Sequence, residues 1–233
     1  HESLREAQQD ERHMADLTLY SYWRSSSSYR VRIALGLKRL AYEYVPVHLV
    51  RDGGEQHWAG FRQRNPLGQV PVLEWADGRA LTQSLPIIEY LDELHPQPPL
   101  LPQEPFWRAH ARMLAEIINA GIQPLQNLSV LQYVEGQCPG IDRHDWAHHF
   151  IAKGLDAVEH NARGHAGTFL VGDTPSLADV CLIPQLYSAR RFGIQPDAFP
   201  TLMRVEEQCM QLEAFRAAHP ARQPDAERVP ASR

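Results

Sequence analysis

The sequence predicts a fold in two parts, an α/β domain followed by an all-helical domain. Apolar residues alternate at 17–22, follow a helical spacing at 29–40 and return to a β-rich run at 42–47. This order predicts a β-α-β unit with a parallel strand pair. Five prolines within 95–105 indicate a semi-rigid linker that separates this region from the rest of the chain.

The segment after the β-α-β unit predicts a loop and a hairpin. Residues 51–64 are polar and favour a loop with a short irregular helix. A turn then leads into a strand that begins at Val70 and contains Pro71, a residue expected in strands only near an edge, a bulge or a turn. Asp77-Gly78 is typical of a hairpin turn, which predicts a returning strand directly after it.

The remaining predicted elements are helices. Residues 84–94 have helical spacing, with Ser84 as the expected N-cap and Pro86 in the first turn. These residues complete an α/β domain over 16–95, and a linker over 96–105 leads to a helical domain over 106–233. The helical domain is expected to contain helices at Trp107–Ala120, Leu125–Glu135, Asp145–Arg163, Leu177–Arg190 and Pro200–Phe215.

Two polar patterns in the helical domain are given no catalytic role, and the first is assigned to folding. Ser176 and Asp179 have the spacing of a capping box, with aspartate in place of the usual glutamate. His144 and His148 form an i, i+4 pair that is compatible with a metal site. No pattern supplies a third ligand, so we expect a solvated helix start there and no metal.

Composition narrows the class of protein. The 233 residues are 43% hydrophobic and 22% charged, which is typical of a soluble globular protein. A net charge of -5 without a basic stretch argues against nucleic-acid binding, and no apolar run is long enough for a membrane helix. Three widely spaced cysteines favour a reducing compartment, and we expect a cytoplasmic protein. Residues 1–15 are expected to be a leader or a disordered arm, because Met14 follows a polar, aperiodic segment.

Four consecutive serines, Ser25–Ser28, lie between the first predicted strand and the first predicted helix. Hydroxyls at this position can cap the helix, and they can also hold an anion or thiolate where the helix dipole is positive. Arg24, Arg30 and Arg32 surround the cluster; we expect Arg30 and Arg32 on the surface or in salt bridges. From the motif alone, a simple cap and an anion site both remain open.

The serine motif and several later blocks together resemble the zeta class of the glutathione transferase superfamily. Residues 25–35 are similar to its Ser-Ser-Cys-X-X-Arg-Val-Arg-Ile-Ala-Leu signature, with Ser27 in place of the cysteine. Other similar blocks occur in order at 52–54, 65–71, 83–85, 122–131 and 213–220. The resemblance spans about Leu17 to Pro224. It implies the glutathione transferase fold, a thioredoxin-like α/β N-terminal domain plus an all-α C-terminal domain.

The resemblance implies an activity as well. Zeta-class enzymes are maleylacetoacetate isomerases, so we expect glutathione-dependent cis-trans isomerisation of maleylacetoacetate to fumarylacetoacetate in tyrosine and phenylalanine catabolism. The serine at position 27 leaves open a maleylpyruvate isomerase of aromatic acid degradation, or a general zeta-class transferase. A non-catalytic binding protein is the alternative of another class, because this fold is reused without catalysis. The family also implies a homodimer.

Site residues follow from the same resemblance. Ser25 matches the serine that contacts the glutathione thiolate, and Ser26 and Ser27 are further catalytic candidates. Arg24 and Arg191 are candidates for the carboxylates of a dicarboxylate substrate, since arginine pairs carboxylates bidentately. The expected glutathione-binding residues, among which Val70-Pro71 should form a cis-proline corner, are Ser25, Gln56, Val70, Pro71, Gln83, Ser84, Gln123, Asn127 and Ser129.

Overall fold

The computed structural model describes residues 17–227, so the expected leader at 1–15 lies outside the described residues. These residues form two compact units. The first unit joins the described residues up to Pro98 to those from Glu213 onward, and the second unit is Pro99–Leu212. This grouping differs from the expected helical domain over 106–233 at one point, because α10 (Glu213–Ala218) groups with the α/β unit; the domain boundaries stay a prediction.

The first unit is built on a four-stranded mixed sheet, as predicted. Its strands, in the order β2-β1-β3-β4, are β2 (Glu43–Pro46), β1 (Leu17–Ser21), β3 (Val72–Trp75) and β4 (Ala80–Thr82). β1 pairs parallel with β2, with Thr18 opposite Glu43, and antiparallel with β3, with Leu19 opposite Leu73. β3 begins one residue after Pro71, so this proline precedes the strand and removes no hydrogen bond from the ladder.

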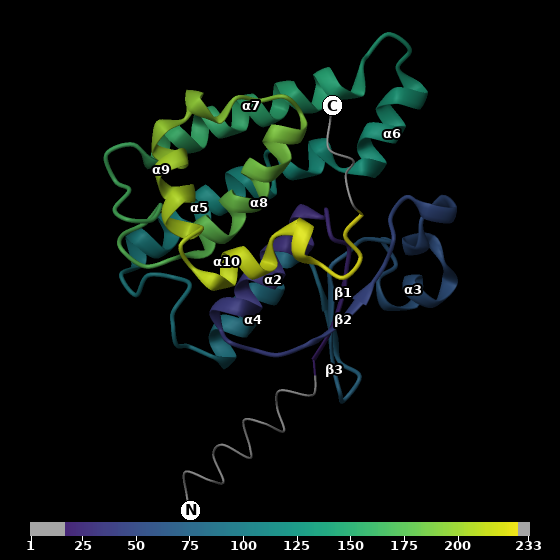
Figure 1. Ribbon diagram of the computed structural model, residues 1–233, viewed down its shortest axis with the longest axis horizontal. Helices are drawn as coiled ribbons and strands as arrows, with labels where there is room; N and C mark the ends of the chain where they lie inside the picture. The colour runs from purple at the N-terminus through teal and green to yellow at the C-terminus, as the bar shows by residue number, and fades with distance from the viewer. Residues whose placement is uncertain (1–16, 228–233) are drawn as a thin grey trace, which may run out of the picture. The chain divides into compact units, whose positions relative to one another are not determined.

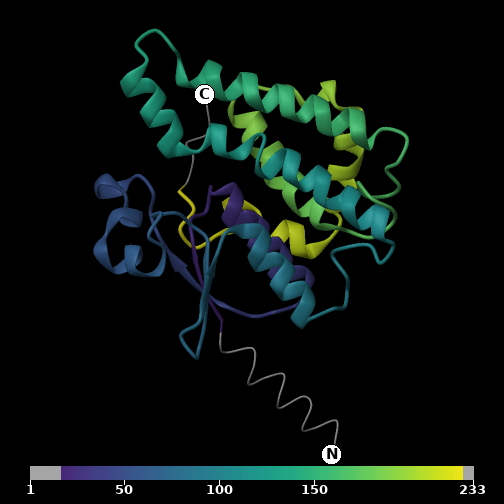
Figure 2. The same cartoon turned by 180° about the vertical axis from the view of Figure 1, so that it is seen from behind.

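Helices cover both faces of this sheet (Figures 1 and 2). α2 (Ser26–Leu37) and α4 (Ser84–Leu94) lie together on one face. α3 (Ala59–Arg64) lies on the opposite face with the 3-10 turns Arg51–Gly53 and Glu55–His57. The buried centre between the sheet and the first pair of helices is apolar and includes Leu19, Ile33, Leu73, Ile87 and Ile88.

Two helix starts differ from the expectation. α2 begins at Ser26, three residues before the predicted start, so most of the serine cluster is helical. Ser84 is not the N-cap of α4, because Gln83 occupies that position and Ser84 is the first helical residue. Gln83 has a φ of 71°, which is not a helical conformation. Gln83 is therefore the N-cap, and the helix starts at Ser84.

Arg32 is buried, contrary to the expected surface position, because the backbone supplies its hydrogen-bond acceptors. Its guanidinium donates to the carbonyl oxygens of Tyr22 at 3.4 Å, Trp23 at 3.0 Å and Ala218 at 3.1 Å, and to Ser21 Oγ at 3.1 Å. Burial lowers the pKa of Arg32 from its ordinary value. A buried cation is tolerated only when its donors are satisfied, and here they join the end of β1 to the C-terminal helix.

That C-terminal helix, α10 (Glu213–Ala218), packs against α2 (Figure 1). A glycine permits the close approach, since a Cβ added at Gly36 would lie 3.1 Å from the Cβ of Ala214. Beyond α10, Asp225 accepts hydrogen bonds from the Trp23 amide at 3.1 Å and the Tyr44 hydroxyl at 2.6 Å. Residues 213–225 are thus an integral part of the first unit.

The second unit is all-helical, and its described residues contain no strand, as predicted. Its helices are α5 (Pro105–Asn119), the 3-10 turn Gln123–Gln126, α6 (Leu128–Gln137), α7 (Arg143–Ala162), α8 (Leu177–Arg191), the 3-10 turn at 196–198 and α9 (Pro200–Cys209). α8 is buried along most of its length and packs against α5. The helix expected at 200–215 is in fact two, because the chain turns after Cys209 before α10 begins.

The predicted capping box at the start of α8 is confirmed. Asp179 Oδ2 accepts hydrogen bonds from the Ser176 amide at 2.8 Å and the Ser176 hydroxyl at 2.9 Å. Its other oxygen accepts the Leu170 amide at 2.8 Å, which ties the preceding turn to the helix. Burial raises the pKa of Asp179 to about 6, although these hydrogen bonds oppose the shift.

Replacing Asp179 should destabilise the protein severely. Asp179→Ala leaves the buried amides of Leu170 and Ser176 without acceptors, and each costs about 1–3 kcal/mol, so the free energy of unfolding should fall by about 2–6 kcal/mol. Urea unfolding at pH 8 measures this loss. Asp173→Ala is the matched control, because Asp173 also accepts two hydrogen bonds, from Thr168, but is exposed. Equal losses for both variants would contradict a special role for the buried box.

Candidate functional site

The serine cluster forms the N-terminus of α2, and Ser25 is its N-cap. Ser25 Oγ accepts the Ser28 amide at 3.1 Å, so the helix cap proposed from the motif is present. A hydroxyl that accepts one hydrogen bond can still donate its own hydrogen. Ser25, Ser26 and Ser27 are half-buried, whereas Ser28 is fully buried. The cap and the anion site are therefore compatible functions of the same serine.

The loop before Ser25 places a cation next to the cluster. The Arg24 guanidinium lies 4.9 Å from the centre of the Trp23 ring and donates to the Tyr22 hydroxyl at 3.2 Å. Trp23 and Tyr22 are buried, while Arg24 is half-buried. Stacking on a buried aromatic ring restricts a long side chain, so Arg24 is held beside Ser25 in a defined orientation.

The predicted cis-proline corner is confirmed, because the Val70–Pro71 peptide bond is cis. Val70 precedes β3, so it lies outside the paired part of the sheet. The turn in front of it is closed by Asn65, whose Nδ2 donates to the Gln69 carbonyl at 2.7 Å and whose Oδ1 accepts the Leu67 amide at 3.1 Å. Sequence reasoning did not single out Asn65, although asparagine before proline is a known turn signal.

At the start of α4, Gln83 and Ser84 form a second polar helix end. The φ of 71° at Gln83 is unusual for a residue other than glycine, and such conformations are concentrated at ligand-binding positions. The Gln83 side chain makes no cap hydrogen bond, which leaves the positive end of the helix dipole available to an anion. Arg30 Nη1 donates to Ser84 Oγ at 3.1 Å, so α2 and α4 are joined directly beneath this helix end.

Gln56 lies in the loop that was expected to contribute to the glutathione site. It is buried, and its Nε2 donates to the Leu49 carbonyl at 3.1 Å. Gly54 makes room for this amide, since a Cβ there would lie 2.5 Å from Gln56 Nε2. Its carbonyl oxygen Oε1 is buried without a hydrogen-bond partner among the described residues. A contact from Gln56 to glutathione stays a prediction.

Four expected site residues belong to the second unit. Gln123 begins the 3-10 turn before α6, and Asn127 caps α6 by accepting the amide and the hydroxyl of Ser129, each at 3.3 Å. Arg191 is the last residue of α8, and its guanidinium lies 5.9 Å from the centre of the Phe192 ring. Their part in binding stays a prediction, as it does for the residues of the first unit.

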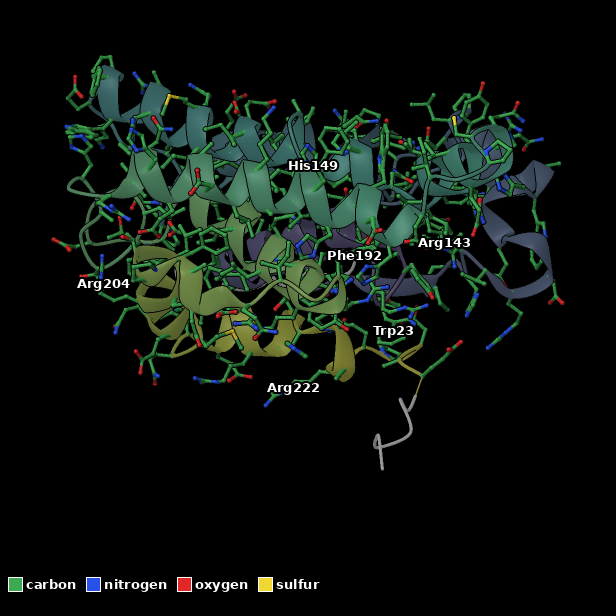
Figure 3. All side chains as sticks on the ribbon, turned by 90° about the horizontal axis from the view of Figure 1, so that it is seen from above. Trp23, Arg143, His149, Phe192, Arg204 and Arg222 are labelled. Atoms are coloured by element: carbon green, nitrogen blue, oxygen red, sulfur yellow. The ribbon has the colours of Figure 1, made fainter. Side chains whose placement is uncertain are left out.

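The histidines of α7 make contacts within the second unit. His144 packs on Phe192 with ring centres 5.6 Å apart, and His148 Nδ1 lies 2.9 Å from the Phe192 carbonyl oxygen. Figure 3 labels Phe192, which follows α8, together with Arg143 and His149 of α7. His144 also groups with the exposed Asp142 and Asp145, but Asp142 is already engaged as the cap of α7.

Two of the three cysteines are buried. Cys181 and Cys209 are buried, and burial raises the pKa of Cys209, so neither is an activated nucleophile. Cys138 is exposed at the end of α6. No described helix is both long enough and apolar enough to cross a bilayer.

Comparison with known proteins identifies the family. Residues 19–99 match the model of the glutathione S-transferase N-terminal domain, and residues 148–213 match that of its C-terminal domain. Maleylacetoacetate isomerase from Mus musculus is 48% identical over 207 residues, covering 89% of this chain and 94% of the mouse protein.

Solved structures agree with these matches. A maleylacetoacetate isomerase from Anaeromyxobacter dehalogenans with bound GSH is 53% identical, has a TM-score of 0.82, and the match covers 91% of this chain and 98% of that one. A zeta-class maleyl pyruvate isomerase in its holo form is 40% identical, with a TM-score of 0.85 and coverage of 90% and 100%. The sequence, the fold and these relatives together establish that this chain belongs to the zeta class of the glutathione transferase family.

Proposed function

We propose that this protein is a glutathione-dependent isomerase that converts maleylacetoacetate to fumarylacetoacetate. The observation that carries the proposal is the N-terminus of α2, where Ser25 caps the helix and keeps a hydroxyl hydrogen to donate. Relatives named maleylacetoacetate isomerase support the substrate, since the two described above are 48% and 53% identical over most of the chain.

The donor groups of the first unit fit glutathione. A tripeptide thiol with a free carboxylate at each end requires donors for an anionic sulfur and for a carboxylate, and the helix ends at Ser25 and Ser84 are of this kind. The backbone of Val70 lies outside the sheet pairing and is suited to the cysteinyl part. Gln56, together with Gln123, Asn127 and Ser129 of the second unit, completes the proposed set.

Bound glutathione supplies a thiolate, which adds to the conjugated double bond, permits rotation about the resulting single bond and leaves again. The protein must keep this sulfur ionised at neutral pH. A free thiol titrates near ~8.5, and lowering its pKa by ~1.5–2 units requires about 2–3 kcal/mol. The Ser25 hydroxyl and the amides and dipole of the first turn of α2 can provide stabilisation of this order.

Arginines are proposed to hold the dicarboxylate substrate. Arg24 lies beside Ser25 in a restrained orientation, and Arg191 ends α8 in the second unit. Their role in the reaction is to keep the alkene carbon near the sulfur and to stabilise negative charge that develops on the conjugated carbonyl during addition. We also propose a cytoplasmic location and a role in aromatic amino acid catabolism, which rest on the family resemblance.

Maleylpyruvate is the alternative substrate, and position 27 motivates it. Serine stands there where the zeta signature has cysteine, and a maleylpyruvate isomerase is among the similar structures. Absorbance assays on both maleyl compounds, with and without glutathione, test the proposal. We expect glutathione-dependent turnover that is faster with maleylacetoacetate. No turnover of either compound, despite glutathione binding, would instead favour a non-catalytic binding protein.

If the serine at position 27 determines which substrate is preferred, Ser27→Cys should change the ratio of the activities on maleylacetoacetate and maleylpyruvate. An unchanged ratio would contradict that role.

Removing the Ser25 hydroxyl should slow the reaction. We expect Ser25→Ala to lower turnover by about 10–100-fold, equivalent to about 1.4–2.7 kcal/mol, with little change in glutathione affinity. Ser27→Ala should have a smaller effect. Because Ser25→Ala also removes a helix cap, Asp142→Ala serves as a matched control that removes the cap of α7. Steady-state kinetics and glutathione titrations would contradict the assignment if all three variants lost activity equally.

A homodimer is proposed as the assembly. The structure offers supporting surface, because Phe106 and Met113 are exposed apolar residues seven positions apart on α5 and therefore share a helix face. Sedimentation at micromolar concentration should give twice the mass of the chain. A monomer under these conditions would refute the proposal.

A further inference from the structure

Arg30 is fully buried on α2, and it donates a hydrogen bond to the second polar helix end, at Ser84. The side chain has an exposed fraction of 0%, and its Nη1 donates to Ser84 Oγ at 3.1 Å. Ser84 is itself only 4% exposed and is the first residue of α4. The Arg30 guanidinium therefore lies next to the proposed carboxylate site.

The hydrogen bond between Arg30 and Ser84 determines what Ser84 can do. A guanidinium has donors only, whereas a serine hydroxyl has one hydrogen and two acceptor sites. Ser84 must therefore be the acceptor in this bond, and its own hydrogen remains to be donated. The described residues provide no acceptor for that hydrogen, although the residue is almost completely buried. Ser84 is thus prepared as a donor to a ligand oxygen.

The electrostatics of the helix end point to an anionic ligand. The N-terminus of α4 carries a partial positive charge, because its first amides have no partner within the helix. Arg30 adds a full positive charge within hydrogen-bond distance of its first residue.

We propose that Arg30 is a positioning residue for the α-carboxylate of the γ-glutamyl group of glutathione. It orients the Ser84 hydroxyl as a donor and supplies the positive potential that favours this carboxylate over a neutral group. The inference rests on the proposed use of glutathione and concerns how that ligand is distinguished from other cysteinyl peptides. It assigns Arg30 no contact with the sulfur or with the substrate.

A pair of ligands tests the proposal. Calorimetric titration compares glutathione with γ-aminobutyryl-cysteinylglycine, which is glutathione without this one carboxylate. The wild-type protein should bind glutathione more tightly. Arg30→Lys keeps the charge but not the fork-shaped donor group, and it should reduce the ratio of the two affinities by about 10-fold or more. The affinity of Arg30→Lys for the analogue should stay within about twofold of the wild-type value, because the analogue lacks the carboxylate that Arg30 is proposed to position.

Arg32→Lys is the matched control. Arg32 is a buried arginine two residues away on the same helix, but its donors go to Ser21, Tyr22, Trp23 and Ala218. It should lower the unfolding temperature without changing the ratio of the two affinities. If Arg30→Lys does not fold, Ser84→Ala provides the same comparison. If both variants fold, the double variant Arg30→Lys/Ser84→Ala should have the same ratio of affinities for glutathione and the analogue as Ser84→Ala alone.

The outcomes separate this inference from the proposed function. Equal weakening of both ligands by Arg30→Lys, or an unchanged affinity ratio in either variant, would show that Arg30 is structural only and would overturn the inference while glutathione use stands. In kinetics, the expected signature is a higher KM for glutathione with kcat largely retained. Failure of the wild-type protein to bind glutathione would overturn the proposed function together with the inference.

Discussion

The buried guanidinium of Arg32 is the interaction on which the geometry of the first unit depends. It binds three backbone carbonyls and one hydroxyl, and its acceptors come from the end of β1, the following loop and the C-terminal helix α10. Because an arginine without acceptors is too costly to bury, all of these segments must be in place together. The loop that carries Ser25 is consequently positioned by a residue on the helix that Ser25 caps.

α2 carries a second buried arginine, Arg30, which contacts a different segment of the first unit. Arg32 serves the loop before the serine cluster, whereas Arg30 reaches Ser84 at the start of α4. The two helix ends, each with unpaired amides and a positive dipole, are thereby linked through side chains of one helix turn. Helix capping and ligand binding are not alternatives in this arrangement. Ser25 accepts one hydrogen bond for the helix and retains one hydrogen for a ligand.

Much of this fold could be read from local sequence patterns. The alternation at 17–22, the Asp77-Gly78 turn and the Ser176–Asp179 box each specify structure within a few residues, and each was confirmed. Arg30 and Arg32 are buried rather than on the surface, because segments distant in sequence cover them, α4 for one and α10 for the other. No local sequence pattern predicts that another helix will cover the charged face of α2.

The discontinuous first unit has a consequence for synthesis of the chain. A ribosome makes the strands and α2 first, but α10 and Asp225, which complete their packing, emerge more than a hundred residues later. All residues of the second unit are made in between, so that unit can become compact while the first is still incomplete. Until Ala218 and Asp225 are made, Arg32 lacks its acceptor on α10 and Trp23 lacks the carboxylate that its amide contacts. The first unit is therefore begun before the second and completed after it, and a nascent chain carries an incompletely packed loop before Ser25.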